Sequence, residues 1–263
     1  MKKIIALLLA LCTIFMFAAC GDKGGSDLAY VTDKGEMLVG ITIFSPMNYY
    51  DDNNELVGFE TEFTKAVCEK LGVTPKFVEI NWDSKEVELN AKNIDCIWNG
   101  MTITEERKEN MSITIPYMDN KQVLIVKADK VAQFEKSLDN AKVVAEQGST
   151  GEELALSHEL LKNVNYTAVD SQAKGLIEVK SGVSDILIAD YTLALGSVGK
   201  GTDFEDLAII DSYTFDSQEY GIAFRKGSDM TEKVNGIMKE LAADGTLLKI
   251  AEKYNLKELL VIK

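Results

Sequence analysis

Asn99-Gly-Met-Thr-Ile-Thr-Glu-Glu-Arg107 follows a short apolar run that ends at Trp98 and is typical of a buried strand. Thr104 stands where the N-cap of a short helix is expected, so the stretch predicts a strand-to-helix turn. Backbone N–H groups without partners collect at such a turn, and the helix dipole favours an anion there. Arg107 adds a planar guanidinium that can bind a carboxylate through two hydrogen bonds. We therefore expect a small molecule with a carboxylate, such as a zwitterion, to bind here.

Strand-like and helix-like segments alternate along the rest of the chain. Strands are expected at 37–43, 76–80, 94–98, 121–127, 143–146, 165–169 and 185–189, and helices at 59–71, 84–91, 152–161, 172–180 and from 191. Short apolar strands between helices indicate parallel sheets that are covered on both faces. The predicted fold class is therefore α/β.

Two segments of the chain resemble each other and predict two similar halves. Ala91-Lys-Asn-Ile-Asp-Cys-Ile-Trp98 and Lys180-Ser-Gly-Val-Ser-Asp-Ile-Leu-Ile188 each run from a helix end through a turn and an Asp into an apolar strand. Candidate ligand groups follow each strand, Gly100 and Thr102 after the first and Asp190 after the second. Because ligands of open α/β sheets bind at the carboxyl ends of strands, two such ends facing each other would form a cleft.

The Asn99–Arg107 run resembles the GMTIT-x-x-R signature of the extracellular solute-binding proteins of polar amino-acid ABC importers, family 3 type. Further segments resemble that family in its order, namely Gly58-Phe-Glu-Thr-Glu-Phe63, Ile115-Pro-Tyr117, Gln147-Gly-Ser-Thr150 and Glu219-Tyr-Gly-Ile-Ala223. The resemblance covers the chain from about Met37 to the C-terminus. It implies a two-lobed, type II periplasmic-binding-protein-like fold, in which each lobe is a mostly parallel sheet flanked by helices and a two-strand hinge joins the lobes.

The same resemblance implies that the chain crosses between the lobes twice, near residues 119–123 and 213–221. Lobe 1 is expected to comprise residues 30–120 and 220–263, because the C-terminal helices of the family return to the first lobe. Lobe 2 is expected to comprise residues 121–219.

The N-terminal residues are interpreted as a targeting segment. Residues 1–19 begin with two lysines, Lys2 and Lys3, which give a positive charge, and continue as an apolar run. This pattern predicts a signal peptide. Phe17-Ala-Ala-Cys20 resembles a lipobox, which implies cleavage before Cys20, lipidation of its thiol and a lipidated tether over residues 20–29. Such a lipid anchors a protein without a membrane-crossing helix. An ordinary signal peptide with an incidental cysteine is the alternative.

The chain is acidic, with a formal net charge of −14 over 263 residues. Such a charge argues against nucleic acid and against adhesion to anionic lipid. His158 is the single histidine, so a Cys/His metal cluster is excluded, and no cofactor or metal is expected. Cys68 and Cys96 are expected to be buried free thiols rather than the disulfide that an extracellular setting would permit. We expect a monomer, lipid-anchored on the extracellular face of a Gram-positive cell membrane.

A free α-amino acid presents a carboxylate and an ammonium, and each needs a partner once water is excluded. Arg107 is the candidate partner for the carboxylate, helped by N–H groups near Thr102 and Thr150. The alternative is that Arg107 only pairs with a neighbouring glutamate on an exposed helix.

Asp190 is the candidate partner for the ammonium, because it follows a strand at a point where a carboxylate can accept several hydrogen bonds. Its alternative role is the N-cap of the helix that follows. The resemblance implies that the carbonyl of Gly100 and the hydroxyl of Thr102 complete the ammonium site. Asn99 and Ser149 belong to the two matching turns and are expected to line the same site.

By the same resemblance, Phe44 and Trp82 are expected to form the wall of a side-chain pocket, with plain core packing as the alternative. Ile41 stands where basic-amino-acid binders of the family tend to carry Asp, so one anchor for a distal cation is missing. Glu146 precedes Gln147 at a pocket-side position and could hold a donor-rich side chain, such as that of glutamine, arginine or cystine. It would repel acidic ligands. This inference requires that Glu146 faces the pocket rather than solvent.

The resemblance thus implies a binding protein, not an enzyme, that captures a polar amino acid between hinged lobes and delivers it to an ABC transporter permease. The alternative is an enzyme on the same scaffold, similar to cyclohexadienyl dehydratases, in which Glu146 or Asp190 would serve as acid or base. The sequence offers no arrangement of nucleophile and base around the isolated His158, so no catalytic residue is expected.

Overall fold

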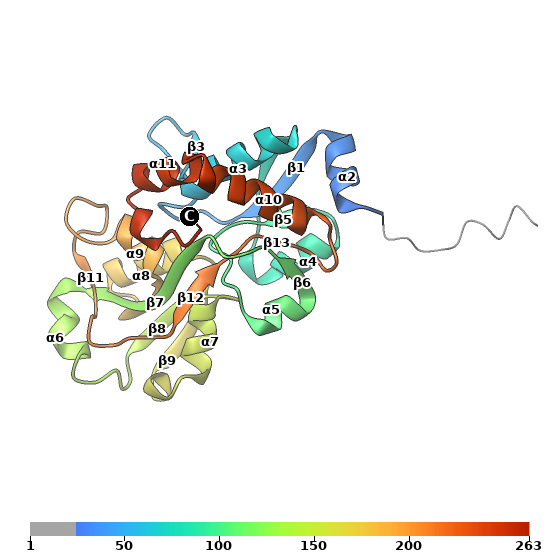
Figure 1. The fold of residues 1–263 in the computed structure, drawn as a ribbon. Helices are drawn as coiled ribbons and strands as arrows, with labels where there is room; N and C mark the ends of the chain where they lie inside the picture. The colour runs from blue at the N-terminus through green and yellow to red at the C-terminus, as the bar shows by residue number, and fades with distance from the viewer. Residues whose placement is uncertain (1–24, 263) are drawn as a thin grey trace, which may run out of the picture.

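The computed structural model describes residues 25–262, which form two α/β lobes (Figure 1). The expected signal peptide over residues 1–19 and the expected lipidation site, Cys20, lie outside the described residues. No helix within residues 25–262 is long and apolar enough to cross a membrane.

The sheet of the first lobe has five strands in the order β4-β1-β5-β13-β6. β1 (Glu36–Ile41) pairs in parallel with β4 (Thr74–Glu79) and β5 (Cys96–Ile97), as expected. β13 (Ala223–Arg225) lies antiparallel between β5 and β6 (Met111–Ile113). A strand that follows residue 220 therefore completes a sheet whose first strand begins at residue 36.

The helices of this lobe are α2 (Asp27–Lys34), α3 (Phe59–Leu71), α4 (Lys85–Asn90), α5 (Glu105–Asn110), α10 (Met230–Ala243) and α11 (Thr246–Lys253), with the 3-10 turns η1 (Trp82–Ser84) and η4 (Lys257–Leu259) and the hairpin strands β2 (Tyr49–Tyr50) and β3 (Leu56–Val57). The C-terminal helices α10 and α11 both pack against α3 (Figure 1). The apolar face of α3 forms the centre of the core, because Phe59 and Phe63 are one turn apart and fully buried. Phe63 meets Trp98 edge to face at 4.9 Å between ring centroids.

The sheet of the second lobe has the order β11-β7-β10-β8-β9, with β12 paired to β7. Its strands are β7 (Met118–Lys127), β8 (Lys142–Glu146), β9 (Asn165–Val169), β10 (Ile186–Asp190), β11 (Leu207–Ile209) and β12 (Ser217–Tyr220), and its helices and 3-10 turns are η2 (Ala128–Lys130), α6 (Val131–Phe134), α7 (Thr150–Ser157), η3 (Glu159–Leu161), α8 (Gln172–Ser181) and α9 (Tyr191–Ser197).

Helices cover both faces of this second sheet, as the apolar strands indicated. Side chains of β10 alternate between the two faces. Leu187 packs in one cluster with Leu176 of α8, whereas Ile186 and Ile188 pack in a different cluster with Ala155 of α7. Burial on both faces explains why β10 is a continuous apolar run.

The expectation of mostly parallel sheets is only half right. β8 is parallel to both β9 and β10, but β7 runs antiparallel to β10 and to β11. β13 breaks the parallel order of the first sheet in the same way. The physical reason is that β7 and β13 lie next to the chain crossings, so they enter their sheets from the end opposite to the strands of the βαβ units.

A two-stranded ladder lies where the chain passes between the lobes. Residues 217–220 of β12 pair with residues 118–121 of β7 in antiparallel register, from Ser217 opposite Lys121 to Tyr220 opposite Met118. The ladder fits the expected two-strand hinge. The expected start of lobe 1 at residue 30 falls inside α2, so residues 27–29 of the expected tether are part of the first lobe. The limits at 120, 121–219 and 220–263 remain a prediction.

Cys68 and Cys96 are buried free thiols, as expected. Gly245 has a left-handed backbone with φ of +78° and separates α10 from α11.

Candidate functional site

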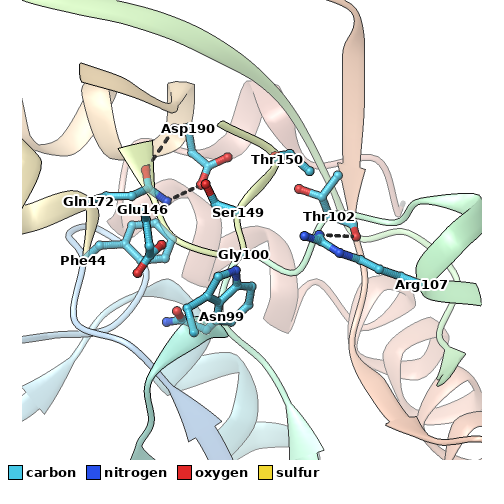
Figure 2. A pocket seen from close by; sticks show the side chains of 11 residues that line it. Phe44, Asn99, Gly100, Thr102, Arg107, Glu146, Ser149, Thr150, Gln172 and Asp190 are labelled. Carbon is cyan, nitrogen blue, oxygen red and sulfur yellow. Dashed lines mark hydrogen bonds between the residues drawn. The ribbon is translucent and has the colours of Figure 1, made fainter. Parts of the chain in front are cut away.

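A small cavity lies between the lobes, and eleven residues line it (Figure 2). They include all ten residues that the sequence marked as site candidates: Phe44, Trp82, Asn99, Gly100, Thr102, Arg107, Glu146, Ser149, Thr150 and Asp190. Gln172 is the eleventh. The structure therefore brings the candidates together, while their role in ligand binding remains a prediction.

Carboxyl ends of strands from both lobes point at this cavity. The turn after β5 carries Asn99, Gly100 and Thr102, whereas Glu146 and Asp190 are the last residues of β8 and β10. Strand ends of α/β sheets leave space and free backbone groups for ligands, so the cavity occupies the expected place.

Arg107 is 5% exposed and faces the cavity from the end of α5's first turn. Its Nη1 donates to the carbonyl of Thr102 at 2.9 Å, and its Nη2 donates to the carbonyl of Gly148 at 3.4 Å. The only acid within 4 Å in the described structure is Glu153 of α7, at 3.7 Å. The alternative of a pair with a neighbouring glutamate on an exposed helix is therefore wrong, because α5 presents Arg107 to the other lobe. Thr104 caps α5 as expected and accepts a hydrogen bond from the Arg107 backbone N–H.

Asp190 is buried, and three side-chain amides surround its carboxylate. Oδ1 accepts from Asn120 at 2.6 Å and from Gln122 at 2.7 Å, and Oδ2 accepts from Gln172 at 2.5 Å. Asp190 occupies the N-cap position of α9, as its alternative role required, but its side chain makes no capping hydrogen bond to that helix. Burial raises the pKa of Asp190, and the amide donors oppose that rise. Neutral amides orient the carboxylate without cancelling its charge.

Gln172, Asn120 and Gln122 are functional candidates that the sequence interpretation missed. Gln172 begins α8 just after β9, so it follows a strand end like the other candidates, and that signal would have found it. Asn120 and Gln122 are two residues apart on β7 and share one face of the strand. Their proximity to Asp190 depends on the pairing of Gln122 opposite Asp190, which no local pattern shows.

Glu146 is 3% exposed and faces the cavity, as the inference from the sequence required. Its Oε1 has no hydrogen-bond partner among the described residues. Burial and then the charge of Asp190 raise the pKa of Glu146 to about 8, while Gln172 and Lys85 oppose the rise. A buried carboxyl oxygen without a donor is costly, so the cavity favours a ligand that supplies one.

Phe44 and Trp82 lie on the wall of the cavity and are 4% and 5% exposed. Phe44 approaches Gly100 so closely that a Cβ on Gly100 would lie 3.0 Å from the ring, and Gly100 has a positive φ of +55°. Only glycine combines that backbone with that contact. Both features keep the aromatic ring against the turn.

Three polar residues of the lining are largely occupied by the protein. The amide of Asn99 donates to the Thr42 carbonyl and to Asn48, both at 2.8 Å. The hydroxyl of Ser149 caps α7 by accepting from the backbone N–H of Glu152, and the hydroxyl of Thr150 accepts from Gln122 at 2.9 Å. Asn99 and Ser149 therefore hold the two turns in shape around the cavity.

The two lobes touch at the rim of the cavity, so the structure is a closed arrangement. Lys85, beside Trp82 in the first lobe, donates to the carbonyl of Gly148 in the second at 3.0 Å, and Gln147 donates to Asp83 at 3.2 Å. A Cβ on Gly148 would lie 2.9 Å from the Asp83 Cα, and the φ of Gly148 is +72°. Glycine thus permits this close approach of the two backbones.

Within residues 25–262, no group of three or more His, Cys, Asp or Glu side chains could hold a metal ion. The lining carries two acids, one arginine and no histidine or cysteine. Such a set can bind opposite charges of a small molecule, but it contains no thiol or imidazole for nucleophilic chemistry.

Comparisons with known proteins agree with this geometry. The sequence model of one protein family, the bacterial extracellular solute-binding proteins, family 3, matches residues 37–257 of the chain. The chain is 30% identical over 260 residues to the arginine-binding extracellular protein ArtP of Bacillus subtilis (strain 168), covering 97% of this chain and 98% of that protein.

Two solved structures show the same fold. One is a substrate-binding protein of an ABC uptake transporter from Streptococcus pneumoniae with bound histidine, with a TM-score of 0.82 and 26% identity. The match covers 91% of this chain and 100% of that protein. The ancestral amino acid-binding protein AncCDT-1, a precursor of cyclohexadienyl dehydratase, has a TM-score of 0.76 and 30% identity, covering 87% and 99%.

Proposed function

The chain belongs to the bacterial extracellular solute-binding proteins of family 3, and from that premise we propose that its inter-lobe cavity captures one free polar amino acid. The observation that carries the proposal is the pair of opposite charges on one small cavity, the Arg107 guanidinium from the first lobe and the Asp190 carboxylate from the second. An amino acid carries the complementary charges on adjacent groups, and each buried charge needs such a partner.

In this proposal Arg107 binds the α-carboxylate, together with the N-terminus of α7 at Thr150. Asp190 binds the α-ammonium, with the carbonyl of Gly100 and the hydroxyl of Thr102 as further acceptors. The buried Asp190 carboxylate is held in place by three amides, so binding requires little reorganisation.

The remaining lining determines which side chain fits. Phe44 and Trp82 offer apolar faces to aliphatic carbons, worth about 1 kcal/mol beyond the buried area. Glu146 favours a side chain with N–H donors, such as that of glutamine, arginine or cystine, and disfavours an acidic one. A micromolar dissociation constant requires about −8 kcal/mol, which these contacts can supply.

Members of the family are extracellular solute-binding proteins, and we propose that this one delivers its amino acid to an ABC permease. The lobes open and close about the β7–β12 ladder, and closure buries the ligand. We further propose a signal peptide over residues 1–19 and a lipid on Cys20 that tethers a monomer to the outer face of the cell membrane. We also propose that the chain passes between the lobes near residues 120 and 220.

An enzyme on the same scaffold is the second candidate, because AncCDT-1 is a precursor of a dehydratase. The feature that favours it is Glu146, whose burial keeps a proton available near neutral pH. The lining offers no second group placed to exchange that proton, since both oxygens of Asp190 are held by amides. We therefore favour binding without turnover.

A thermal-shift screen against free amino acids, with mass spectrometry of each mixture, tests the proposal. We expect one or a few ligands with N–H donors in the side chain to raise the Tm by several degrees, because ligand that binds only the folded state stabilises it. The ligand should be recovered unchanged. Failure of every amino acid to shift the Tm, or conversion of a cyclohexadienyl acid such as prephenate, would contradict the proposal.

A further inference from the structure

Three ionisable side chains line the cavity, and a zwitterion uses two of them. Arg107 matches an α-carboxylate and Asp190 an α-ammonium, which leaves Glu146 without a counter-charge. Figure 2 shows Glu146 and Asp190 on the same side of the cavity, with Gln172 beside both. The third charge therefore faces whatever the ligand carries beyond its α-carbon.

Glu146 differs from Asp190 in how its oxygens are satisfied. Both oxygens of Asp190 accept hydrogen bonds from amides, but Oε1 of Glu146 has no partner within the part of the chain that the structure describes. A side chain that is almost wholly buried and keeps an unpartnered oxygen at a cavity needs a donor from the ligand.

Among residues 25–262, no lysine or arginine forms an ion pair with Glu146. Lys85 of α4 is the charged group that attracts it, but Lys85 Nζ donates to the carbonyls of Trp82 at 3.2 Å and of Gly148 at 3.0 Å. Asp190 of β10 repels it, and Gln172 of α8 is neutral. On the neighbouring strand β9, Val169 lies opposite Glu146 and is apolar.

Resting on the function proposed above, we infer that Glu146 binds the distal cation of a basic amino acid and releases a proton when it does so. In the empty cavity the carboxyl group holds a proton. When the cation enters, the O–H bond of Glu146 breaks, the proton goes to the solvent buffer, and a carboxylate–cation pair forms in the closed cavity. Binding of a basic amino acid is thus coupled to pH, whereas binding of a neutral amino acid of the same shape is not coupled through Glu146.

The energetics of Glu146 agree with this exchange. Its pKa is raised to about 8, so roughly nine tenths of the free protein carries the proton at pH 7. A cation within a few ångströms lowers the pKa of a carboxyl group and favours its charged form. The complex therefore binds fewer protons than the free protein, and affinity for the cation rises with pH up to about 8 and then levels off.

L-arginine and its neutral isostere L-citrulline provide a matched pair of probes. Calorimetry in phosphate and in Tris buffer at pH 7 gives the number of protons that each ligand releases. We expect L-arginine to release close to one proton more than L-citrulline. Protons that leave Asp190 when the common α-ammonium binds cancel in this difference. Affinity for L-arginine should rise about tenfold between pH 6 and pH 7.

Glu146→Gln, which keeps the size and removes the proton, supplies the second arm. We expect this variant to lower the affinity for L-arginine at least about thirtyfold, because the buried cation loses its partner. The affinity for L-citrulline should change less than about threefold. The extra proton release should disappear. Glu159→Gln, an exposed glutamate in the same lobe, is the control that leaves both ligands unchanged.

The outcomes separate this inference from the function on which it rests. Equal proton release for the two probes, or unchanged L-arginine affinity in Glu146→Gln, overturns the inference and leaves an amino-acid-binding protein. Tighter binding of L-citrulline than of L-arginine by the wild-type protein also overturns it. If no free amino acid binds, the proposed function fails and the inference falls with it.

Discussion

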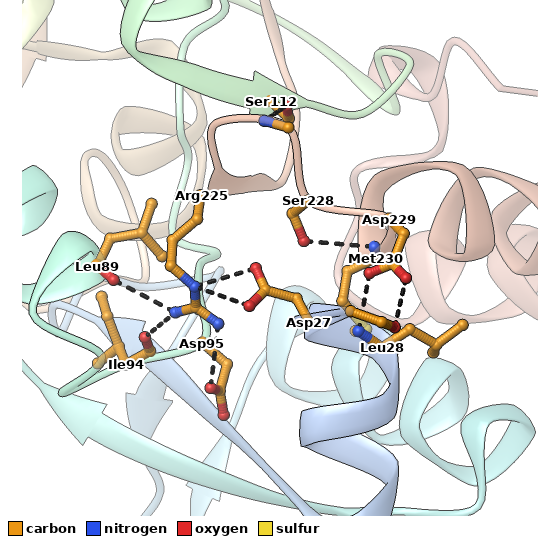
Figure 3. Close-up of polar contacts among 12 residues, drawn as sticks. Asp27, Leu28, Leu89, Ile94, Asp95, Ser112, Arg225, Ser228, Asp229 and Met230 are labelled. Atoms are coloured by element: carbon orange, nitrogen blue, oxygen red, sulfur yellow. Dashed lines mark hydrogen bonds and ion pairs between the residues drawn. The ribbon is translucent and has the colours of Figure 1, made fainter. Parts of the chain in front are cut away.

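Two buried clusters of charged groups differ in one respect, and the difference separates structure from function. In the first lobe, Arg225 of β13 is surrounded by partners (Figure 3). Its Nε donates to both oxygens of Asp27 at 3.2 and 3.0 Å, and its Nη1 donates to the carbonyls of Leu89 and Ile94. The adjacent Asp95 pairs with Lys34 at 2.6 Å. Arg225 Nη2 and Asp95 Oδ1 have no hydrogen-bond partner among the described residues, but they form an ion pair at 3.5 Å, so here the charges meet within the protein.

In the cavity the charges face one another without meeting. Arg107 donates to backbone carbonyls and lies 3.7 Å from Glu153, which does not line the cavity. Asp190 is held by neutral amides, and one oxygen of Glu146 has no partner among the described residues. A paired buried cluster holds elements together, and Arg225 with Asp27 fastens α2 to the sheet. Buried charges without partners at a cavity destabilise the ligand-free protein. A ligand of complementary charge removes that destabilisation when it binds.

The largest effect should come from breaking the paired cluster. Arg225→Ala leaves Asp27 buried without its partner and two carbonyls without their donor, so we expect a loss of about 3–5 kcal/mol in the free energy of unfolding, measured with urea. Lys253→Ala removes a surface pair with Glu62 and should cost at most about 1 kcal/mol. Similar losses for the two variants would contradict the comparison.

Next in size is the loss of the guanidinium from the cavity. Arg107→Ala should weaken the binding of the amino acid found in the thermal-shift screen by about 2–5 kcal/mol, because the α-carboxylate would be buried without a partner. Calorimetry measures this, and urea unfolding of the ligand-free variant should show a far smaller change. Lys108→Ala, the exposed neighbour on α5, is the control that should bind normally. Near-native affinity of Arg107→Ala would refute the role assigned to it.

A smaller effect should appear in the pH dependence of the ligand-free protein. Burial raises the pKa of Glu146 to about 8 and that of Glu60 to about 7. The folded state then binds more protons than the unfolded state between about pH 5 and pH 8, so these two groups lower stability as pH rises through that window. The Tm, measured by thermal unfolding at pH 5.5 and at pH 8, should decrease less between these two pH values in Glu146→Gln than in the wild type. An unchanged or larger decrease would mean that Glu146 is not protonated in the empty cavity.

The smallest effect should come from the rim of the cavity. Lys85 donates across the lobes to the Gly148 carbonyl and within its own lobe to the Trp82 carbonyl, but it does not line the cavity. Lys85→Met should therefore remove one contact of the closed form and one local hydrogen bond. We expect a loss of about 0.5–1.5 kcal/mol in ligand affinity without a change in ligand preference. Calorimetry with the preferred amino acid and its nearest competitor measures both. A change in preference would place Lys85 within the ligand site instead.

Local sequence was enough to predict much of the site. The strand end before Asn99, the cap at Thr104 and the matching strand end before Asp190 identified both walls of the cavity. These features depend on neighbours in sequence, such as apolar alternation, capping hydroxyls and turn glycines, so a single chain reveals them. The partners of Asp190 escaped because Asn120 and Gln122 reach it through an antiparallel pairing of β7 with β10.

By itself, the sequence determined the main strands and helices of both sheets and the charged residues near the strand ends, but not the short strands β2, β3, β6, β11 and β13. Tertiary structure alone decided how those charges are used. Arg107 and Glu146 are buried in the folded protein, and within residues 25–262 Glu146 has no ion pair, because the nearby Lys85 donates to two carbonyls instead. Desolvation and pairing are properties of the surroundings in space, whereas propensity and capping are properties of neighbours along the chain.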